Sequence, residues 1–353
     1  RVDEGERLGA APRANSGRGV SYWQDDSGNG RIIVVTPGYQ MVALDPHSGQ
    51  QIEGFGEGGV VDLMSQHRSR DGIDMVGSVG ASSPATVAGD VLVVGSAHHI
   101  GMRPPSKTNT PGDIRGYDAQ SGELLWTFKT IPEPGEFGVD TWENESWSYT
   151  GNAAAWAPIA YDPESGFVYV PTEAATGDYY GGHRHGNNLF STSLVALDSR
   201  TGERVWHFQT IHHDIWDWDN PTSPILADLT IDGAPRKIVA QITKQGFVFV
   251  FDRLTGDPIW PIEERAVPQT DIPGEWTSPT QPIPTKPLPF EPQGFSEDDL
   301  IDFTPEIKAR AAEIASAYRM GPLYTPASLQ DAPDGTAGVL SLPSSTGGAN
   351  WEG

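Results

Sequence analysis

The chain of 353 residues contains no cysteine, which excludes disulfide bonds and thiolate metal sites and leaves the redox compartment undecided. Basic side chains are scarce: 23 Lys and Arg stand against 47 Asp and Glu, and the formal charge of −24 argues against nucleic acid as a partner. Long hydrophobic runs are also missing, since VLVVGSA and FVFVF have only the length of a strand. The polar opening RVDEGERLGA resembles the interior of a longer chain, so we expect a fragment.

Glycine, proline and aromatic residues are plentiful. The 41 Gly and 30 Pro predict many turns, and 11 Trp, 10 Tyr and 12 Phe suffice for a large packed core rather than a disordered chain. Four strings share one pattern, in which an apolar pair leads to Asp, then to Gly four residues later, then to an apolar strand that usually carries Trp. They are ALDPHSGQQIEGF (43–55), GYDAQSGELLWTF (116–128), ALDSRTGERVWHF (196–208) and VFDRLTGDPIW (250–260).

Each string predicts a β-hairpin. The Asp side chain can bond the turn backbone, and the Gly supplies the positive φ that a tight turn needs. The aspartates are Asp45, Asp118, Asp198 and Asp252, and the glycines are Gly49, Gly122, Gly202 and Gly256.

A second hairpin precedes each of the last three strings, in 82–96, 155–172 and 223–243. Two hairpins make four antiparallel strands, which is the content of one propeller blade. The repeat spacing is irregular, which indicates long insertions on one face, where binding sites are built. The sequence therefore predicts an all-β fold of about three to four four-stranded blades. The blade pieces are 18–56, which we expect to be the end of an earlier blade, 81–128, 153–208 and 222–263.

The remaining chain changes in character. Residues 264–346 are predicted to be an insertion, with a Pro-rich loop over 267–292 and one amphipathic helix, PEIKARAAEIASAYRM (305–320). Thr304 followed by Pro305 marks the helix start, and Gly321 with Pro322 marks its end. Residues 347–353 would open a further blade, so we expect 1–353 to be a single partial propeller domain.

The stretch HHDIWDWDN (212–220) is the densest group of chemically active side chains. On an extended segment Asp217 and Asp219 would share one face, while Trp216 and Trp218 would share the other. A carboxylate held against indole rings is partly desolvated, which raises its pKa and suits it to accept a proton. The alternative is structural, with the tryptophans in the core and the aspartates capping turns.

Taken together and in order, the Asp-Gly-Trp hairpins, RGVSYW, AWAPIAYDP, HHDIWDWD, TKQGFVFVFDR and GGANW resemble the pyrroloquinoline quinone (PQQ) dependent dehydrogenases. The resemblance covers nearly the whole chain and is closest to the glucose, sugar and polyol dehydrogenase branch. It implies an eight-bladed propeller, of which this chain is a partial ring, with PQQ near the axis beside a divalent cation, usually calcium.

The resemblance also implies roles for individual residues. Asp217 takes the place of the general base, and Lys244, 27 positions later in ITKQG, takes that of the basic residue beside the quinone carbonyl. The competing interpretation of Lys244 is a surface lysine at a strand end. The matching cofactor contacts are Arg18 to the quinone carboxylates, Trp156 beneath the quinone ring, Thr176 near the cofactor, and Asn350 with Trp351 in the next blade. Trp156 could equally be a blade-core residue.

The sequence departs from the family around the cofactor. The adjacent cysteines that form a ring disulfide in many members are absent, and Asn15, Ser16 and Gly17 precede Arg18. The calcium ligands of the alcohol-oxidising branch are not evident in GSAHHIGM and PTEAATGD. Asp217 and Glu173 supply the oxygen atoms that calcium prefers, or the quinone itself holds most of the ion. His98, His99, His212 and His213 have two interpretations: they bind a transition metal, or they shape the substrate entrance.

Two functions follow from these patterns. The first is PQQ-dependent oxidation of an alcohol, sugar or polyol, with electrons passed to a respiratory quinone or cytochrome c. Its setting would be the periplasm, with any membrane attachment through segments outside this chain. The second is a non-catalytic propeller scaffold of the outer-membrane assembly type. The pairing of HHDIWDWD with TKQG favours the enzyme, because a scaffold does not need a base and a cation at that spacing.

Overall fold

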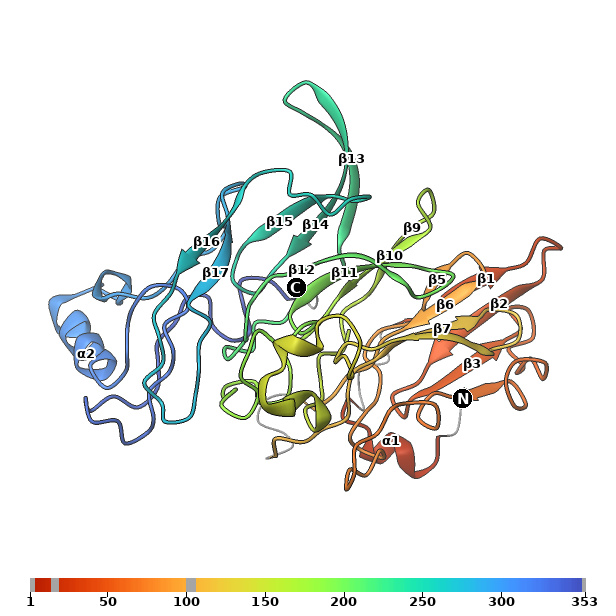
Figure 1. Ribbon diagram of the computed structural model, residues 1–353, viewed down its shortest axis with the longest axis horizontal. Helices are drawn as coiled ribbons and strands as arrows, with labels where there is room; N and C mark the ends of the chain where they lie inside the picture. Colours follow the sequence, from red (N-terminus) through yellow and green to blue (C-terminus); the bar gives the residue numbers. More distant parts are fainter. Residues whose placement is uncertain (1–3, 14–18, 100–105, 351–353) are drawn as a thin grey trace.

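The computed structural model describes residues 4–13, 19–99 and 106–350. Their fold is all-β, with three consecutive four-stranded antiparallel sheets whose strands follow chain order (Figure 1). The first sheet holds β1 (Ser21–Gln24), β2 (Gly30–Val35), β3 (Gln40–Leu44) and β4 (Val60–Asp62); the second holds β5 (Thr86–Ala88), β6 (Val91–Val94), β7 (Ile114–Asp118) and β8 (Leu124–Phe128); the third holds β9 (Ala160–Asp162), β10 (Phe167–Pro171), β11 (Ser193–Asp198) and β12 (Arg204–Gln209). The first sheet is thus complete rather than the end of an earlier blade, because β4 lies beyond the predicted piece 18–56.

The predicted hairpin turns are confirmed in all four strings. Each Asp accepts hydrogen bonds from backbone N–H groups two or three residues ahead, as Asp45 Oδ1 does from His47 and Ser48. Each Gly has a φ between 71° and 76° and donates its N–H to the carbonyl of the same Asp. The turn chemistry is therefore encoded within five residues of sequence.

Tryptophans of the repeat join neighbouring sheets. The indole of Trp126, at the end of the second sheet, donates to the carbonyl of Ser199 in the third sheet at 3.0 Å. The indole of Trp206 in β12 donates to the carbonyl of Arg253, which follows β15 of the next sheet, at 3.1 Å. A Cβ at Gly202 would lie 2.5 Å from the Trp126 ring, so glycine is needed there for close packing as well as for φ.

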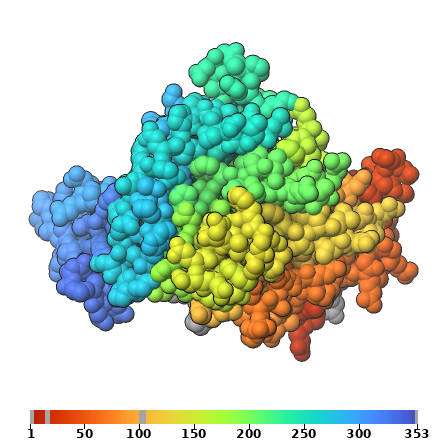
Figure 2. Space-filling model, viewed as in Figure 1, coloured from red at the N-terminus to blue at the C-terminus, as the bar shows by residue number. Residues whose placement is uncertain are grey.

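The fourth repeat forms an incomplete sheet. Strands β13 (Ile225–Ile231), β14 (Ala234–Ile242) and β15 (Val248–Asp252) pair in order, and the tip of the β13–β14 hairpin projects from the molecule (Figure 2). A single bridge, Phe251 to Pro258, stands where a fourth strand was expected. Instead β16 (Ile262–Ala266) pairs with β17 (Thr280–Pro284), so one strand interrupts the Pro-rich loop predicted over 267–292. Among the described residues β17 pairs only with β16, so its other edge forms no ladder and proline is tolerated in it.

Helices are few in the described residues. They comprise α1 (Glu6–Ala10), α2 (Pro305–Ala315) and the 3₁₀ segments Val139–Thr141, Glu143–Ser148 and Glu297–Asp299. Thr304 caps α2 as predicted, with its hydroxyl accepting from Ile307 N–H. The helix ends five residues early because Arg319 N–H bonds the Gly338 carbonyl instead of continuing the helical pattern. Only Ala315 is buried, so the predicted apolar face does not pack into the core.

In the part of the chain that is described, no helix has the length and apolarity to cross a membrane.

Candidate functional site

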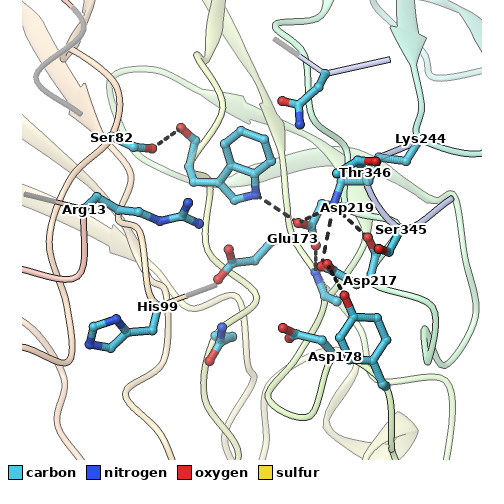
Figure 3. Close-up of a pocket in the computed structure, with 15 residues that line it drawn as sticks. Arg13, Ser82, His99, Glu173, Asp178, Asp217, Asp219, Lys244, Ser345 and Thr346 are labelled. Atoms are coloured by element: carbon cyan, nitrogen blue, oxygen red, sulfur yellow. Dashed lines mark hydrogen bonds and ion pairs between the residues drawn. The ribbon is translucent and has the colours of Figure 1, made fainter. Parts of the chain in front are cut away.

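A cavity of about 480 Å³ lies among segments that precede or follow strands of several sheets (Figure 3). Arg13 and His99 border it on one side, and Asp217, Asp219 and Lys244 border it on the other. Arg13 precedes β1 and the other four residues follow strands, so all five lie outside the strands; the sheets act as the rigid support and the connections carry the chemistry.

Lys244 is the positive centre of this cavity. It follows β14 and is 5% exposed, so the interpretation as a surface lysine is wrong. Its Nζ donates to the Asp217 carbonyl at 2.7 Å and to Asp219 Oδ2 at 3.3 Å, and it lies 3.5 Å from Asp217 Oδ1. Burial lowers the pKa of Lys244, but Asp219 and Asp217 outweigh burial and raise it above the usual range. The ammonium group therefore stays charged throughout the physiological pH range.

The backbone around Asp217 is a tight turn and not the extended segment that was predicted. Asp217 has φ of 58°, and the fully buried Asp214 accepts from the N–H groups of Trp216 and Trp218. Trp216 and Trp218 still share one side, stacked with ring centroids 5.7 Å apart, and Asp217 and Asp219 still face the cavity together. The side-chain arrangement expected from alternation is thus reached by a different backbone conformation.

Asp217 has the raised pKa expected of a desolvated carboxylate. Burial and the neighbouring Asp219 raise the pKa of Asp217 to about 8, against the lowering effect of Lys244. Tyr179 donates a hydrogen bond to its Oδ2 at 3.2 Å. A carboxylate of this kind, beside a cavity and a fixed cation, is suited to accept a proton from a bound ligand.

Trp156 lies at the cavity wall and not in a blade core. Its indole donates to Asp219 Oδ2 at 3.1 Å, and Asp219 Oδ1 accepts from Ala174 N–H at 2.7 Å. By contrast, Trp126 and Trp206 bond backbone carbonyls of the next sheet. Asp219 therefore links the Trp156 ring to Lys244, and the structure brings together the three groups that sequence analysis singled out.

Glu173 and Asp178 add two more carboxylates to the cavity. Glu173 Oε1 lies 3.1 Å from Nδ1 of the buried His98. Burial, followed by repulsion from Asp217 and Asp219, raises the pKa of Asp178 to about 9. Sequence analysis missed Asp178 because the string ATGDYYGG has neither a periodic pattern nor a metal-ligand spacing.

The predicted metal site at Asp217 and Glu173 stays a prediction. Among the described residues, no group of three or more His, Asp or Glu side chains is arranged to hold an ion. Both residues nevertheless line the same cavity, and carboxylate oxygens suit calcium. Of the four histidines considered, His99 lines the cavity, whereas His212 lies 3.1 Å from Glu264 and His213 lies 3.3 Å from Glu275.

The other predicted cofactor contacts have different outcomes. Asn350 lines the cavity. Thr176 is buried behind it, where its hydroxyl donates to Oδ1 of Asn152, a residue that does line the cavity. Arg18 and Trp351 lie outside the described residues.

Consecutive four-stranded antiparallel sheets, with a cavity lined by carboxylates and a lysine beside them, are typical of β-propeller blades that surround a binding site. The profile of the family described as "PQQ: Glucose/ethanol/alcohol dehydrogenase, beta-propeller domain" matches residues 1–353. The chain therefore belongs to this family, whose members use PQQ together with a metal ion.

Individual relatives agree with this assignment. The glycerol dehydrogenase large subunit of Gluconobacter oxydans (strain 621H) is 34% identical over 98% of this chain and 46% of its own length. The quinoprotein glucose dehydrogenase of Escherichia coli (strain K12) is 33% identical over 72% of this chain and 31% of its own length. The quinohemoprotein alcohol dehydrogenase ADHIIG of Pseudomonas putida HK5 has a similar structure, with a TM-score of 0.64 and 25% identity over 98% of this chain and 42% of that one. The chain thus spans less than half the length of these relatives.

Proposed function

We propose that this protein oxidises an alcohol, sugar or polyol with PQQ as the electron acceptor, and that Asp217 is the general base. The convergence of Asp217, Lys244 and Trp156 on one cavity is the observation that carries the proposal. The chain would then form part of an eight-bladed ring, with its sheets as consecutive blades.

The residues present fit the cofactor. Lys244 and Arg13 provide positive charge at the cavity for an anionic quinone, and the Trp156 indole provides a flat apolar surface for a planar ring. Glu173, Asp178 and Asp217 crowd carboxyl groups into a small volume, and burial together with repulsion from neighbouring carboxylates raises the pKa of Asp178 and of Asp217. A calcium ion bound by Asp217 and Glu173 would relieve that repulsion.

Each protein group has a defined task in the reaction. PQQ, when bound, supplies the acceptor for the hydride that leaves the substrate carbon. Asp217 takes the hydroxyl proton of the substrate, so that the carbonyl product forms as the C–H bond breaks. Lys244, held in place by Asp219, supplies the positive charge that stabilises the negative charge developing in the cavity.

We infer the class of substrate and of electron acceptor from the family. Relatives named as glycerol, glucose and alcohol dehydrogenases all act on CH–OH groups, and a small alcohol or sugar suits the polar cavity. A respiratory quinone or cytochrome c would take the electrons onward, and the periplasm is the compartment in which we expect the reaction.

A dye-reduction assay tests this function. The protein loaded with PQQ and calcium should reduce an artificial electron acceptor in the presence of at least one member of a panel of alcohols, sugars and polyols. Asp217→Asn should lower turnover by about 10²–10⁴-fold while keeping the absorbance of the bound quinone, because the shape of the cavity is kept and the base is lost. Full activity in Asp217→Asn would refute the base, and no bound quinone in the wild type would refute the cofactor.

A further inference from the structure

The two carboxylate oxygens of Asp217 have different environments. Oδ2 accepts the hydrogen bond from the Tyr179 hydroxyl, whereas Oδ1 lies 3.5 Å from Lys244 Nζ in a longer ion pair. The strong bond of Lys244 goes instead to the backbone carbonyl of Asp217, at 2.7 Å. Lys244 thus fixes the main chain of Asp217, and the orientation of the carboxylate depends on a second contact.

Tyr179 lies where it can provide that contact. It lines the cavity and is 40% exposed, so its hydroxyl is placed near solvent and still points to Asp217. The loop that carries it is held firmly. Fully buried Arg184 donates to the carbonyls of Thr176 and Gly177, and Glu275 from the insertion accepts from Gly181 N–H at 2.6 Å.

The same arginine connects this loop to the turn that bears Asp217. Arg184 Nη2 donates to the Asp214 carbonyl at 2.5 Å, and Asp214 in turn accepts from the backbone N–H groups that flank Asp217. The relative placement of Tyr179 and Asp217 is therefore set by buried contacts and not by the exposed phenol. A hydrogen bond between two groups placed in this way costs little ordering entropy when it forms.

We propose that Tyr179 is a positioning residue for the general base: its hydroxyl holds Oδ2 of Asp217 and leaves Oδ1 turned to receive the substrate proton. This inference rests on the proposed function. In the reaction the substrate O–H bond would break with its proton moving to Oδ1, and PQQ, when bound, would supply the acceptor for the hydride from the carbon that bears this oxygen. Tyr179 keeps its own proton throughout, because burial and the neighbouring Asp217 raise the pKa of its phenol although Ser345 also bonds it.

The test compares Tyr179→Phe with a matched change at the next residue. Tyr180 is 36% exposed, close to the value for Tyr179, and does not line the cavity. Both variants remove one hydroxyl and keep the ring, so any loss of stability should be similar. Holoprotein of each is assayed for kcat, KM, the kinetic isotope effect with C-deuterated substrate, and PQQ affinity. Crystal structures of the unloaded proteins then report the rotamer of Asp217.

For Tyr179→Phe we expect kcat to fall roughly tenfold, because a hydrogen bond to a charged group orients the base. KM and PQQ affinity should stay at wild-type values, the isotope effect should not decrease, and the Asp217 carboxylate should leave its wild-type rotamer. Tyr180→Phe should match the wild type in every measurement. A wild-type kcat in Tyr179→Phe, or an equal loss in both variants, would overturn the inference.

Asp217→Asn separates this inference from the proposed function on which it rests. If Asp217→Asn is inactive and Tyr179→Phe is fully active, Tyr179 has no positioning role but the base assignment stands. If Asp217→Asn is as active as the wild type, the base assignment fails, and the inference fails with it.

Discussion

At the residue scale, the cavity depends on close approaches that leave no room for an added atom. The segment 344–348 covers Lys244, and Gly348 N–H donates to the Lys244 carbonyl at 2.9 Å. A Cβ at Gly347 would lie 2.6 Å from Cβ and Cγ of Lys244, and Gly347 also has φ of 84°. Glycine at 347 therefore lets the chain lie directly on the lysine that carries the positive charge.

Gly347→Ala should accordingly displace Lys244 or the covering segment. We expect turnover of the PQQ-loaded protein to fall about tenfold or more, because a shift of about 1 Å in a charged group of the site is costly. The control is Gly335→Ala, where φ is 79° but a Cβ would meet nothing within 4 Å. Equal activity of the two variants would show that the contact with Lys244 is unimportant.

The residues of the site were predictable only in part. Asp217, Lys244 and Trp156 could be found because each lies in a motif shared with a known family, and Asp217 also stands out in a dense acidic and aromatic stretch. Asp178 and Tyr179 could not, because their role arises when the loop after β10 meets the turn after β12. The environment of Glu275 depends in the same way on an insertion folding back onto distant residues.

At the scale of elements, each hairpin turn depends on residues that are close in sequence, whereas the pairing of strands into a whole sheet depends on residues that are far apart in sequence. The Asp-Gly turns were predictable because five residues contain both the side-chain acceptor and the positive-φ glycine. The fourth strand β4, the strand β17 and the early end of α2 were not predictable, since each depends on a backbone partner far from its own sequence pattern.

Two turn glycines allow a test of sheet-to-sheet packing. Gly49 and Gly202 have φ of 71° and 72°, but a Cβ meets nothing within 4 Å at Gly49 and meets the Trp126 ring at 2.5 Å at Gly202. Gly49→Ala should lower the free energy of unfolding by about 1 kcal/mol from backbone strain, and Gly202→Ala by about 2–4 kcal/mol because overpacking is added. Denaturant unfolding measures the free energy of unfolding of both variants. Equal losses would show that the Trp126 side chain moves aside at little cost.

Strand β12 carries a histidine that should make stability depend on pH. His207 packs edge-on against Phe190, with ring centroids 5.0 Å apart, and Arg204 Nη1 donates to its Nδ1 at 3.1 Å. Burial and the nearby Arg204 lower the pKa of His207 to about 4. The folded protein disfavours the charged form of His207. The contribution of neutral His207 to the free energy of unfolding is therefore complete above about pH 6.5 and is lost as the pH falls toward 4.

His207→Phe should remove this dependence. Between pH 7 and pH 4.5 we expect the wild type to lose about 1–2 kcal/mol more unfolding free energy than the variant, after allowing for partial solvent screening. Urea titrations at the two pH values provide the measurement, with the exposed His47→Phe as a control that should behave as the wild type. The prediction fails if His207→Phe and the wild type lose stability in parallel.

At the scale of the whole molecule, the cavity joins the sheets into one unit. Its lining comes from residues before β1, after β6, after β10, after β12, after β14 and from the segment that ends the described chain. Four carboxyl groups face one another there, and burial together with their mutual repulsion raises the pKa of Asp178 and of Asp217 although Lys244 lies beside them. Binding of an ion and a planar ligand at this place would therefore stabilise several sheets at once.

PQQ with calcium should consequently raise the midpoint of thermal unfolding. At a hundredfold excess over Kd the gain is about 2.7 kcal/mol, which corresponds to several degrees for a chain of this size. Differential scanning calorimetry with and without EDTA separates the contribution of the ion from that of PQQ. In Glu173→Gln the calcium contribution should shrink, and an unchanged midpoint in the wild type would contradict binding at the cavity.

The central claim is that Asp217 removes the proton of a substrate bound beside PQQ. The most direct measurement is an anaerobic stopped-flow mixing of the PQQ-loaded protein with its substrate, followed by the absorbance of the bound cofactor in a single turnover. The wild type should show rapid reduction, and Asp217→Asn with equal cofactor content should be slower by about 10²–10⁴-fold. Reduction at the same rate in both proteins would contradict the account.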